Sequence, residues 1–390
     1  MEAEYFNLRI RNASAHAPQD KAYFIDRHDH LRITAAIKTD VVRGAKVSIS
    51  GTQNFRLEKF RENGIVIPID KPCDRFSNVT VHDETLRLFN SKENLLAQNP
   101  LRQTTLRGLE CLQSDSGWRL TMSGIWPGET QCVVLLGFDI DGVSSWLNRD
   151  PSFKDHPSLM SMAEYGPSVA TPRILDMLDS HSVQASFYVP GYVAETHKEM
   201  VAEIFRRGHE IAHHGYMHEP PSSLTREQEI DVIESGIRIL SGITGEQPLG
   251  YRSPSWELSE HSLELLTDHG FIYDSSLMGD DAPYIVESPT NGKSLVELPV
   301  HWLLDDAPNF VYAPVANRLG PMRNPDEVYQ TWAAEFEGLY RYGRAFTLTM
   351  HPQYIGRPGR LLMLERLIEH IKSFPNVEFM RAIDVAEMWR

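Results

Sequence analysis

The first third of the chain carries short runs of alternating or β-branched residues, separated by clusters of Asp, Ser, Gly and Pro. Residues 46–50 and 64–69 are two such runs, and this pattern is typical of strands. Trp126 and the Pro-Gly pair after it end the pattern, because Pro and Gly interrupt regular structure. We therefore predict a separate β-rich domain over residues 1–128, whose role the sequence leaves open.

After this boundary, strand-like and helix-like segments alternate. Residues 133–138 form a continuous apolar run, the kind of segment that fills a parallel sheet buried on both faces. Thr171 and Pro172 predict a helix start. Thr225-Arg-Glu-Gln228 has the pattern of a capping box, and Gly245 is the expected end of that helix. Residues 129–390 are thus expected to consist of repeated strand–helix–strand units.

The same alternation continues to the C-terminus. The later segments are helices near 260–269, 325–342 and 359–373, and strands at 271–273, 295–298, 346–349 and 377–379. Because about seven or eight strands alternate with helices, we predict an α/β fold, a distorted (β/α)7–8 barrel that is closed or nearly closed.

The composition narrows the class of protein. The 390 residues are 41% hydrophobic and 23% charged, with a mean hydropathy of −0.34, and these values are typical of a globular protein. A net charge of −15 disfavours nucleic acid and anionic membrane surfaces as partners. The sequence is also compatible with a homo-oligomer.

Cysteine usage and the N-terminal segment bear on the compartment. Cys73, Cys111 and Cys132 form no CxxC pair, so they predict neither a disulfide framework nor a thiolate metal site. No window has the apolar run of a secretory leader or of a membrane span. We therefore expect a cytoplasmic protein.

Two carboxylates follow the apolar run at 133–138. Asp139 and Asp141 are two residues apart, so they share one side of the strand if the strand continues. Two neighbouring carboxylates resist being charged together, and a bound cation removes that conflict. The alternative is a solvated strand end or a helix cap, which is the more common reading of an isolated DxD.

Four histidines lie within ten residues. His209 and His213 are four residues apart, and so are His214 and His218. That spacing places two imidazoles on one face of a helical turn, and neutral imidazole is a good ligand for zinc. Spacing alone does not choose between the two pairs. The alternative is that the histidines are structural residues satisfied by hydrogen bonds.

Two further polar residues follow predicted strands, Arg252 in Tyr-Arg-Ser-Pro and His351 in Leu-Thr-Met-His-Pro. An Arg at a strand end can hold a catalytic carboxylate ionised, and a His can donate a proton to a departing amine. Each residue alone is more often structural.

Taken together and in order, these segments over about residues 132–390 resemble the polysaccharide deacetylase family, the NodB-homology hydrolases. The resemblance implies that Asp139 is the general base and Asp141 a metal ligand. The family's second motif is matched only by His214-Gly-Tyr-Met-His218, so it selects this pair as the other two ligands. It further implies that Arg252 is the partner of the base, that His351 is the general acid, and that the metal is a divalent cation, zinc above others.

The chain also departs from the common glycan deacetylases, because Ile140 separates the two aspartates that are adjacent in their first motif. Tyr165-Gly166 and the segments 273–281 and 298–306 are similar to a branch that includes peptidoglycan deacetylases, deacetylase-type allantoinases and cyclic imide hydrolases. From these features we predict four substrate contacts, namely Tyr165, Trp256, Asp274 and Trp302.

The sequence leaves three functions open. The first is a hydrolase of carbon–nitrogen bonds other than peptide bonds that removes the acetyl group from an acetylated amino sugar or a related amide. The second is a hydrolase that opens a cyclic imide or ureide, as an imidase or allantoinase does. The third is an inactive barrel used for carbohydrate binding. In each case the partner is a glycan or small-molecule amide.

Overall fold

The computed structural model describes residues 125–390 and, before them, only the backbone of eleven strands. The chain divides into two units, Met1–Pro127 and Gly128–Arg390. The strands of the first unit are β1 (Phe6–Asn7), β2 (Ala22–Ile25), β3 (Leu31–Ala35), β4 (Ser48–Ser50), β5 (Phe60–Arg61), β6 (Gly64–Ile69), β7 (Phe76–His82), β8 (Thr85–Asn90), β9 (Gln103–Arg107), β10 (Leu109–Ser114) and β11 (Gly117–Met122). The other residues before 125 lie outside the described part, so a β-rich N-terminal domain over 1–128 and its role stay predictions.

The second unit is built on one sheet with the order β17-β18-β16-β15-β14-β13-β12-β19, and β20 pairs with β12. Its strands are β12 (Cys132–Asp139), β13 (Ser186–Val189), β14 (Glu210–His213), β15 (Gly250–Tyr251), β16 (Tyr273–Asp274), β17 (Tyr284–Glu287), β18 (Ser294–Glu297), β19 (Ala345–Met350) and β20 (Val377–Met380). Neighbouring strands are parallel except β17 and β18, which are antiparallel.

This architecture confirms the predicted α/β fold class, with one correction. Within Gly128–Arg390 the sheet does not close, because β17 and β19 lie at its two ends, and it forms a curled half-barrel. Strand β12 lies beside the end strand β19 and is buried along its whole length, as its apolar run predicts. It pairs with β13 near its carboxyl end and with β20 near its amino end. Because it also pairs with β19, it has three neighbouring strands.

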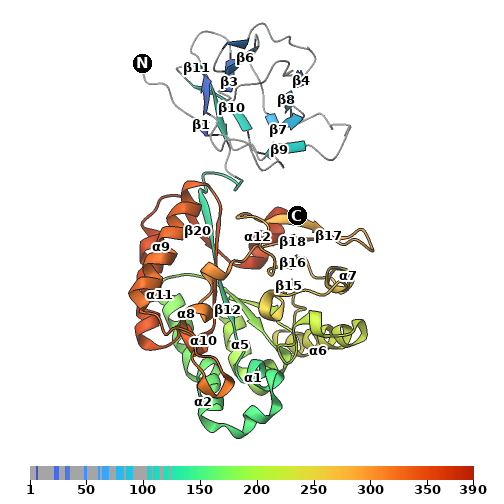
Figure 1. Cartoon of the computed structure of the whole chain (residues 1–390), viewed down its shortest axis with the longest axis vertical. Helices are drawn as coiled ribbons and strands as arrows, with labels where there is room; N and C mark the ends of the chain where they lie inside the picture. The colour runs from blue at the N-terminus through green and yellow to red at the C-terminus, as the bar shows by residue number, and fades with distance from the viewer. Residues whose placement is uncertain are drawn as a thin grey trace. The chain divides into compact units, whose positions relative to one another are not determined.

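Helices cover the outside of the sheet. They are α1 (Ser144–Arg149), α2 (Pro157–Tyr165), α3 (Thr171–Ser180), α4 (Gly191–Thr196), α5 (Lys198–Arg206), α6 (Arg226–Thr244), α7 (Ser262–Asp268), α8 (Ala307–Phe310), α9 (Pro325–Arg341), α10 (Pro352–Ile355), α11 (Pro358–Lys372) and α12 (Ala382–Trp389). Helices α9 and α11 pack together on one flank, and α6 and α7 lie at the opposite flank (Figure 1). In residues 125–390 no helix combines the length and the apolar character needed to cross a membrane.

Short helical turns complete the connections. They are η1 (Pro151–Asp155), η2 (Gly166–Ala170), η3 (Pro221–Ser223), η4 (Pro254–Trp256), η5 (Trp302–Leu304) and η6 (Pro314–Ala316).

Sequence signals at the helix ends were informative in one place and misleading in another. At α6, Thr225 and Gln228 form the predicted capping box, and Gly245 ends the helix in the left-handed conformation. Helix α3 begins at Thr171 as predicted, but Thr171 does not act as its N-cap, because α2, the π-helical turn η2 and α3 follow one another without a break. The Thr171 hydroxyl instead donates a hydrogen bond back to the carbonyl of Gly166 at 3.0 Å.

Helix α6 packs against β14 through a glycine. A Cβ atom on Gly236 would lie 2.0 Å from Nε2 of His213. We therefore expect Gly236→Ala to lower the free energy of unfolding by about 1–3 kcal/mol, because overpacking outweighs the better helix propensity of Ala. Gly242, on the same helix, has nothing within 4 Å of its would-be Cβ, so Gly242→Ala should raise the free energy of unfolding by about 0.5–1 kcal/mol. Urea unfolding of both variants checks this, and effects of the same sign would contradict it.

Candidate active site

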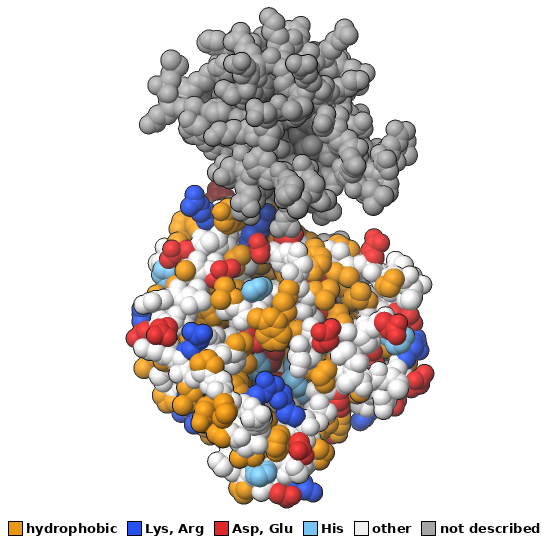
Figure 2. Space-filling view, viewed as in Figure 1, with side chains coloured by type: hydrophobic (Ala, Val, Ile, Leu, Met, Phe, Trp, Pro, Cys, Tyr) orange, Lys and Arg blue, Asp and Glu red, His pale blue; other side chains and the backbone are white. Residues whose placement is uncertain are grey.

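The candidate site lies where four strands of the sheet end. Asp139 is the last residue of β12, and Asp141 follows two residues later. His214, Arg252 and His351 each come directly after a strand, namely β14, β15 and β19. Because the carboxyl ends of parallel strands meet at one edge of a sheet, residues far apart in sequence converge there. Figure 2 shows histidine and acidic side chains in a hollow in the middle of this face, next to basic side chains.

Asp139 and Arg252 form a buried ion pair. Nη1 of Arg252 donates to Oδ1 of Asp139 at 2.8 Å, and both residues are almost completely buried. The guanidinium also donates to the carbonyl and the hydroxyl of Ser275 and lies 3.8 Å from the centre of the Tyr188 ring. Gly137 makes room for it, since a Cβ there would lie 2.8 Å from Nη1. These contacts fix the arginine and leave Oδ2 of Asp139 available.

Three side chains form a group with the geometry of a metal site. The ligand atoms of Asp141, His214 and His218 all lie within 4.8 Å of one another. Oδ1 of Asp141 lies 3.6 Å from Nε2 of His214, and Oδ2 lies 3.5 Å from Nε2 of His218. Both Asp141 Oδ1 and His214 Nε2 are buried and have no hydrogen-bond partner. A buried polar atom without a partner needs an explanation, and a shared cation would satisfy both atoms.

The hydrogen bond of the His214 ring supports the interpretation as a metal site. Its Nδ1 lies 2.7 Å from the carbonyl oxygen of Arg252, which can only accept, so Nδ1 carries the ring proton. Nε2 therefore presents its lone pair toward Asp141. A histidine oriented in this way by a backbone carbonyl is the usual arrangement of a metal ligand. The residues present thus fit a divalent cation.

The protonation states also suit a metal. Burial opposes the charge on Asp141, but His218, His214 and His351 outweigh it and hold the pKa of this carboxyl below its usual range. Burial lowers the pKa of His218 to about 4, against the pull of Asp141. At neutral pH Asp141 is therefore ionised and His218 is neutral, the forms that bind a cation.

The other histidine pair lies elsewhere. Nδ1 of His209 accepts a hydrogen bond from the backbone N–H of Ala185 at 3.2 Å, and Nε2 of His213 lies 3.2 Å from the carbonyl of Ile233. Burial lowers the pKa of both rings to about 4, so both are neutral structural residues.

The prediction that a spacing of four residues places two imidazoles on one face of a helical turn is wrong for both histidine pairs. His213 is the last residue of β14, so the pair that it forms with His209 does not lie on a helix. His214 and His218 lie on a loop, where Gly215 and His218 have positive φ angles of 72° and 64°. This loop brings the two rings together.

His351 is held by one carboxylate. Its Nδ1 lies 2.7 Å from Oδ1 of Asp306, and its backbone N–H donates to Oδ2 of the same residue at 3.0 Å. Nε2 therefore faces the metal-site residues and lies 3.8 Å from Oδ2 of Asp141. Asp305, Asp306 and His351 form a second group of ligand-type atoms within 4.8 Å. Because both oxygens of Asp306 already accept from His351, we assign this group to orienting the ring.

The Asp306 contact predicts a pH dependence. Burial opposes the charge on His351, but Asp306 and other carboxylates outweigh it and raise the pKa of the ring well above its usual range. If the protonated ring is required, turnover falls as pH rises through this raised pKa, above the ordinary imidazole value of about 6.5. Asp306→Asn removes the main stabilising charge, so the alkaline limb of kcat/KM against pH should move to lower pH. Asp326→Asn changes an exposed aspartate and should leave the profile in place, whereas an unmoved limb in Asp306→Asn would argue against this role for the pair.

A cavity of about 620 Å³ opens above these residues. Trp256 and Trp302 both line it, with ring centres 4.3 Å apart. Trp302 is 48% exposed, so it offers an aromatic face to solvent and to a ligand. Arg149 and Arg318 add positive charge to the lining.

Tyr165 and Asp274, predicted as substrate contacts, are not among the residues that line this cavity. The hydroxyl of Tyr165 accepts from Arg173 at 2.8 Å, and its ring lies under Arg357. Asp274 is 1% exposed and accepts from the hydroxyl of Ser276 at 2.7 Å. The structure thus brings neither side chain to this cavity, and their role as substrate contacts stays a prediction.

Sequence reasoning also missed residues that the structure places here. Asp306 could have been found, because it belongs to an adjacent pair of carboxylates in the segment 298–306 that carries the subgroup resemblance. Arg149 and Arg318 gave no signal, since exposed arginines on a short helix and a loop resemble ordinary surface residues.

Comparisons with known proteins agree with this geometry. Residues 154–273 match the model of the polysaccharide deacetylase family. The chain is 33% identical over 282 residues to a peptidoglycan deacetylase of Helicobacter pylori, covering 66% of this chain and 96% of that protein. It is similar to the crystal structure of a protein assigned as a polysaccharide deacetylase from Mycobacterium smegmatis, with 40% identity, 67% and 91% of the two chains covered and a TM-score of 0.65.

An allantoinase, PuuE, is also similar in structure. It is 26% identical, the match covers 68% of this chain and 92% of that chain, and the TM-score is 0.60. The extent of these matches and the convergence of the motif residues at one edge of the sheet lead to one assignment. The chain belongs to the polysaccharide deacetylase family, whose members are hydrolases that act on carbon–nitrogen bonds other than peptide bonds.

Proposed function

We propose that this protein is a zinc-dependent hydrolase that removes the acetyl group from an N-acetylated amino sugar. The observation that carries the proposal is the pair of buried, partnerless atoms Asp141 Oδ1 and His214 Nε2, 3.6 Å apart. They lie between two groups suited to proton transfer, the Asp139–Arg252 pair and the His351–Asp306 pair. Few other arrangements of these residue types explain all three features together.

The donor set supports zinc in particular. Asp141, His214 and His218 would supply one carboxylate oxygen and two imidazole nitrogens, a set that zinc accepts in hydrolytic enzymes. When bound, the cation would polarise the carbonyl of the substrate and make water a stronger nucleophile at neutral pH.

The proton transfers fall to two side chains. Oδ2 of Asp139 is the base, since Oδ1 is held by Arg252 and Oδ2 lies 3.9 Å from Nε2 of His214. Arg252 holds this carboxylate in place through their hydrogen bond. Nε2 of His351 is the acid that protonates the departing nitrogen, since Nδ1 is occupied by Asp306. The base lies beside His214 and the acid beside Oδ2 of Asp141, so they reach the candidate metal site next to different ligands, as attack and departure on opposite sides of the substrate would require.

The shape of the cavity supports a sugar substrate. Neighbouring aromatic side chains such as Trp256 and Trp302 provide flat apolar surface with polar edges, which suits the faces of a sugar ring. The volume of about 620 Å³ is ample for more than one ring in a site that binds small molecules. The curated relative from Helicobacter pylori, a peptidoglycan deacetylase, fits the same class of substrate.

A second candidate function is the opening of a cyclic imide or ureide. The similarity to an allantoinase at 26% identity and a TM-score of 0.60 favours it. The same catalytic groups would serve, because a cyclic amide also requires a base for water and an acid for nitrogen. A single small ring would leave most of the cavity empty, so we rank this function second. An inactive, carbohydrate-binding barrel ranks third, because each motif position carries a residue able to act.

One screen separates these functions. The purified full chain is assayed with and without added zinc for acetate release from N-acetylglucosamine oligomers, and for ring opening of succinimide and allantoin. We expect zinc-dependent acetate release. Ring opening without acetate release would favour the second function, and no turnover with either class at full zinc occupancy would support the third.

A further inference from the structure

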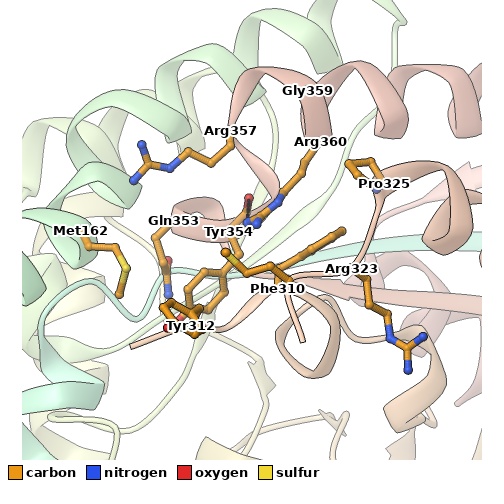
Figure 3. Close-up of a pocket in the computed structure, with 11 residues that line it drawn as sticks. Met162, Phe310, Tyr312, Arg323, Pro325, Gln353, Tyr354, Arg357, Gly359 and Arg360 are labelled. Atoms are coloured by element: carbon orange, nitrogen blue, oxygen red, sulfur yellow. Dashed lines mark hydrogen bonds between the residues drawn. The ribbon is translucent and has the colours of Figure 1, made fainter. Parts of the chain in front are cut away.

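A second cavity lies beside the candidate active site and has no role in the proposed reaction. Its volume is about 490 Å³. Apolar side chains from α2, α8 and the loop before α9 form much of its lining, among them Met162, Phe310 and Tyr312 (Figure 3). Tyr354 lines this cavity and also the active-site cavity, so the two share a wall.

Three arginines and no acidic residue line this cavity. They are Arg323, Arg357 and Arg360. Arg360 donates to the carbonyl of Tyr354 at 3.0 Å and lies over the ring of Phe310, and Arg357 lies over the ring of Tyr165. Within the part of the chain that the structure describes, none of the three forms an ion pair with a carboxylate. Two of these positive charges are therefore held in place by the fold and remain unneutralised by a direct partner.

A buried amide without partners lies in the same lining. Gln353 is 2% exposed, and both its Nε2 and its Oε1 lack a hydrogen-bond partner. A buried amide in this state is rare in proteins, because its donors and its acceptor are normally satisfied. Figure 3 shows this side chain extending from α10 toward Tyr312 in the middle of the lining. A ligand with polar atoms in the cavity would supply the missing partners.

The start of helix α11 adds a further positive feature. The helix begins at Pro358, has no side-chain cap and has no acidic residue in its first turn. Gly359, in that first turn, lines the cavity. The N-terminus of a helix carries partial positive charge and so favours an anion. Here Pro358 has no backbone N–H, and those of Arg360 and Leu361 donate to the carbonyl of Arg357, so the first turn offers the N–H of Gly359.

We propose that this cavity binds a small organic anion, a phosphate or carboxylate group attached to a flat apolar body. The charged group lies by Arg360 and the first turn of α11, with Gln353 as a hydrogen-bond partner. The apolar body packs against Phe310, Tyr312 and Met162. Because Tyr354 separates this cavity from the active-site cavity, the ligand contacts a residue next to the catalytic groups without occupying their place.

Phenyl phosphate is a suitable probe, with inorganic phosphate and phenol as its two halves. Binding to the full chain is measured by isothermal titration calorimetry at constant ionic strength. We expect one phenyl phosphate to bind per chain at least 10-fold more tightly than either half. Arg360→Met and Gln353→Leu should each weaken binding about 10-fold or more, the scale of a lost charge-assisted hydrogen bond. Arg341→Met, which changes an exposed arginine outside the cavity, should leave the affinity unchanged.

A further variant distinguishes this cavity from the active site. Asp141→Asn weakens the candidate metal site, where phosphate could also bind, and should retain phenyl phosphate binding. Loss of binding in Asp141→Asn would assign the probe to the active site and overturn the proposal. Unchanged affinity in both Arg360→Met and Gln353→Leu, with circular dichroism showing that they fold, would also overturn it. A molar mass by light scattering that falls in Arg323→Met would instead assign this surface to contact between copies of the chain.

Discussion

Replacing His351 by Ala should lower turnover by about 10²–10⁴-fold while leaving metal content almost unchanged, since this is the usual worth of a positioned proton donor. The side chain is not in the Asp141 group of metal ligands, and its Nδ1 is held by Asp306. An amide cannot expel an unprotonated nitrogen at a useful rate, so the variant lacks the proton donor that the reaction needs but keeps its metal ion. The measurement is kcat on the substrate identified by the screen, together with metal analysis of the same sample.

A histidine outside the site provides the control. His370 lies on α11, and its Nε2 is 3.1 Å from Glu337. His370→Ala should retain normal turnover. If His351→Ala also retains near-normal turnover with its metal present, another group supplies the proton and the assigned role of His351 is wrong.

Arg252→Met should destabilise the fold by about 3–5 kcal/mol, because it leaves the buried carboxylate of Asp139 without its ion partner. Both residues are at most 2% exposed and are joined by a hydrogen bond of 2.8 Å. Turnover should fall as well, since the catalytic carboxylate loses the hydrogen bond that holds it in position. Urea unfolding at neutral pH measures the first effect and kcat/KM the second.

The double variant Asp139→Asn/Arg252→Met separates charge from packing. It removes both members of the ion pair, so most of the lost stability should return while activity stays absent. If the double variant is as unstable as Arg252→Met, the loss comes from the other contacts of Arg252, which are with Ser275 and the Tyr188 ring.

The fold class and the convergence of residues at the strand ends could be predicted because both follow from local sequence. The apolar run at 133–138 is the buried strand β12, and residues after β12, β14, β15 and β19 meet because parallel strands end at one edge. The choice of His214 and His218 over His209 and His213 came from the family motif. Both pairs have the same spacing, and only the loop with positive φ at Gly215 explains which rings converge.

The remaining features depend on contacts between distant segments. Three such features join residues that are not neighbours in a local pattern. They are the open edge of the sheet, the π-helical turn η2 before Thr171 and the contact of Asp306 with His351. Tyr165 and Asp274, by contrast, form hydrogen bonds with residues near them in the chain, Arg173 and Ser276, and their role as substrate contacts stays a prediction.

The metal assignment is tested by a zinc titration of the metal-depleted full chain, followed by acetate release from N-acetylglucosamine oligomers. We expect turnover to rise in proportion to bound zinc and to reach its plateau at one zinc per chain. His218→Ala, which lacks one of the three ligands, should neither retain zinc at that stoichiometry nor recover turnover. Full acetate release by the metal-depleted chain, or normal zinc binding and turnover in His218→Ala, would contradict the assignment of Asp141, His214 and His218 as the catalytic metal site.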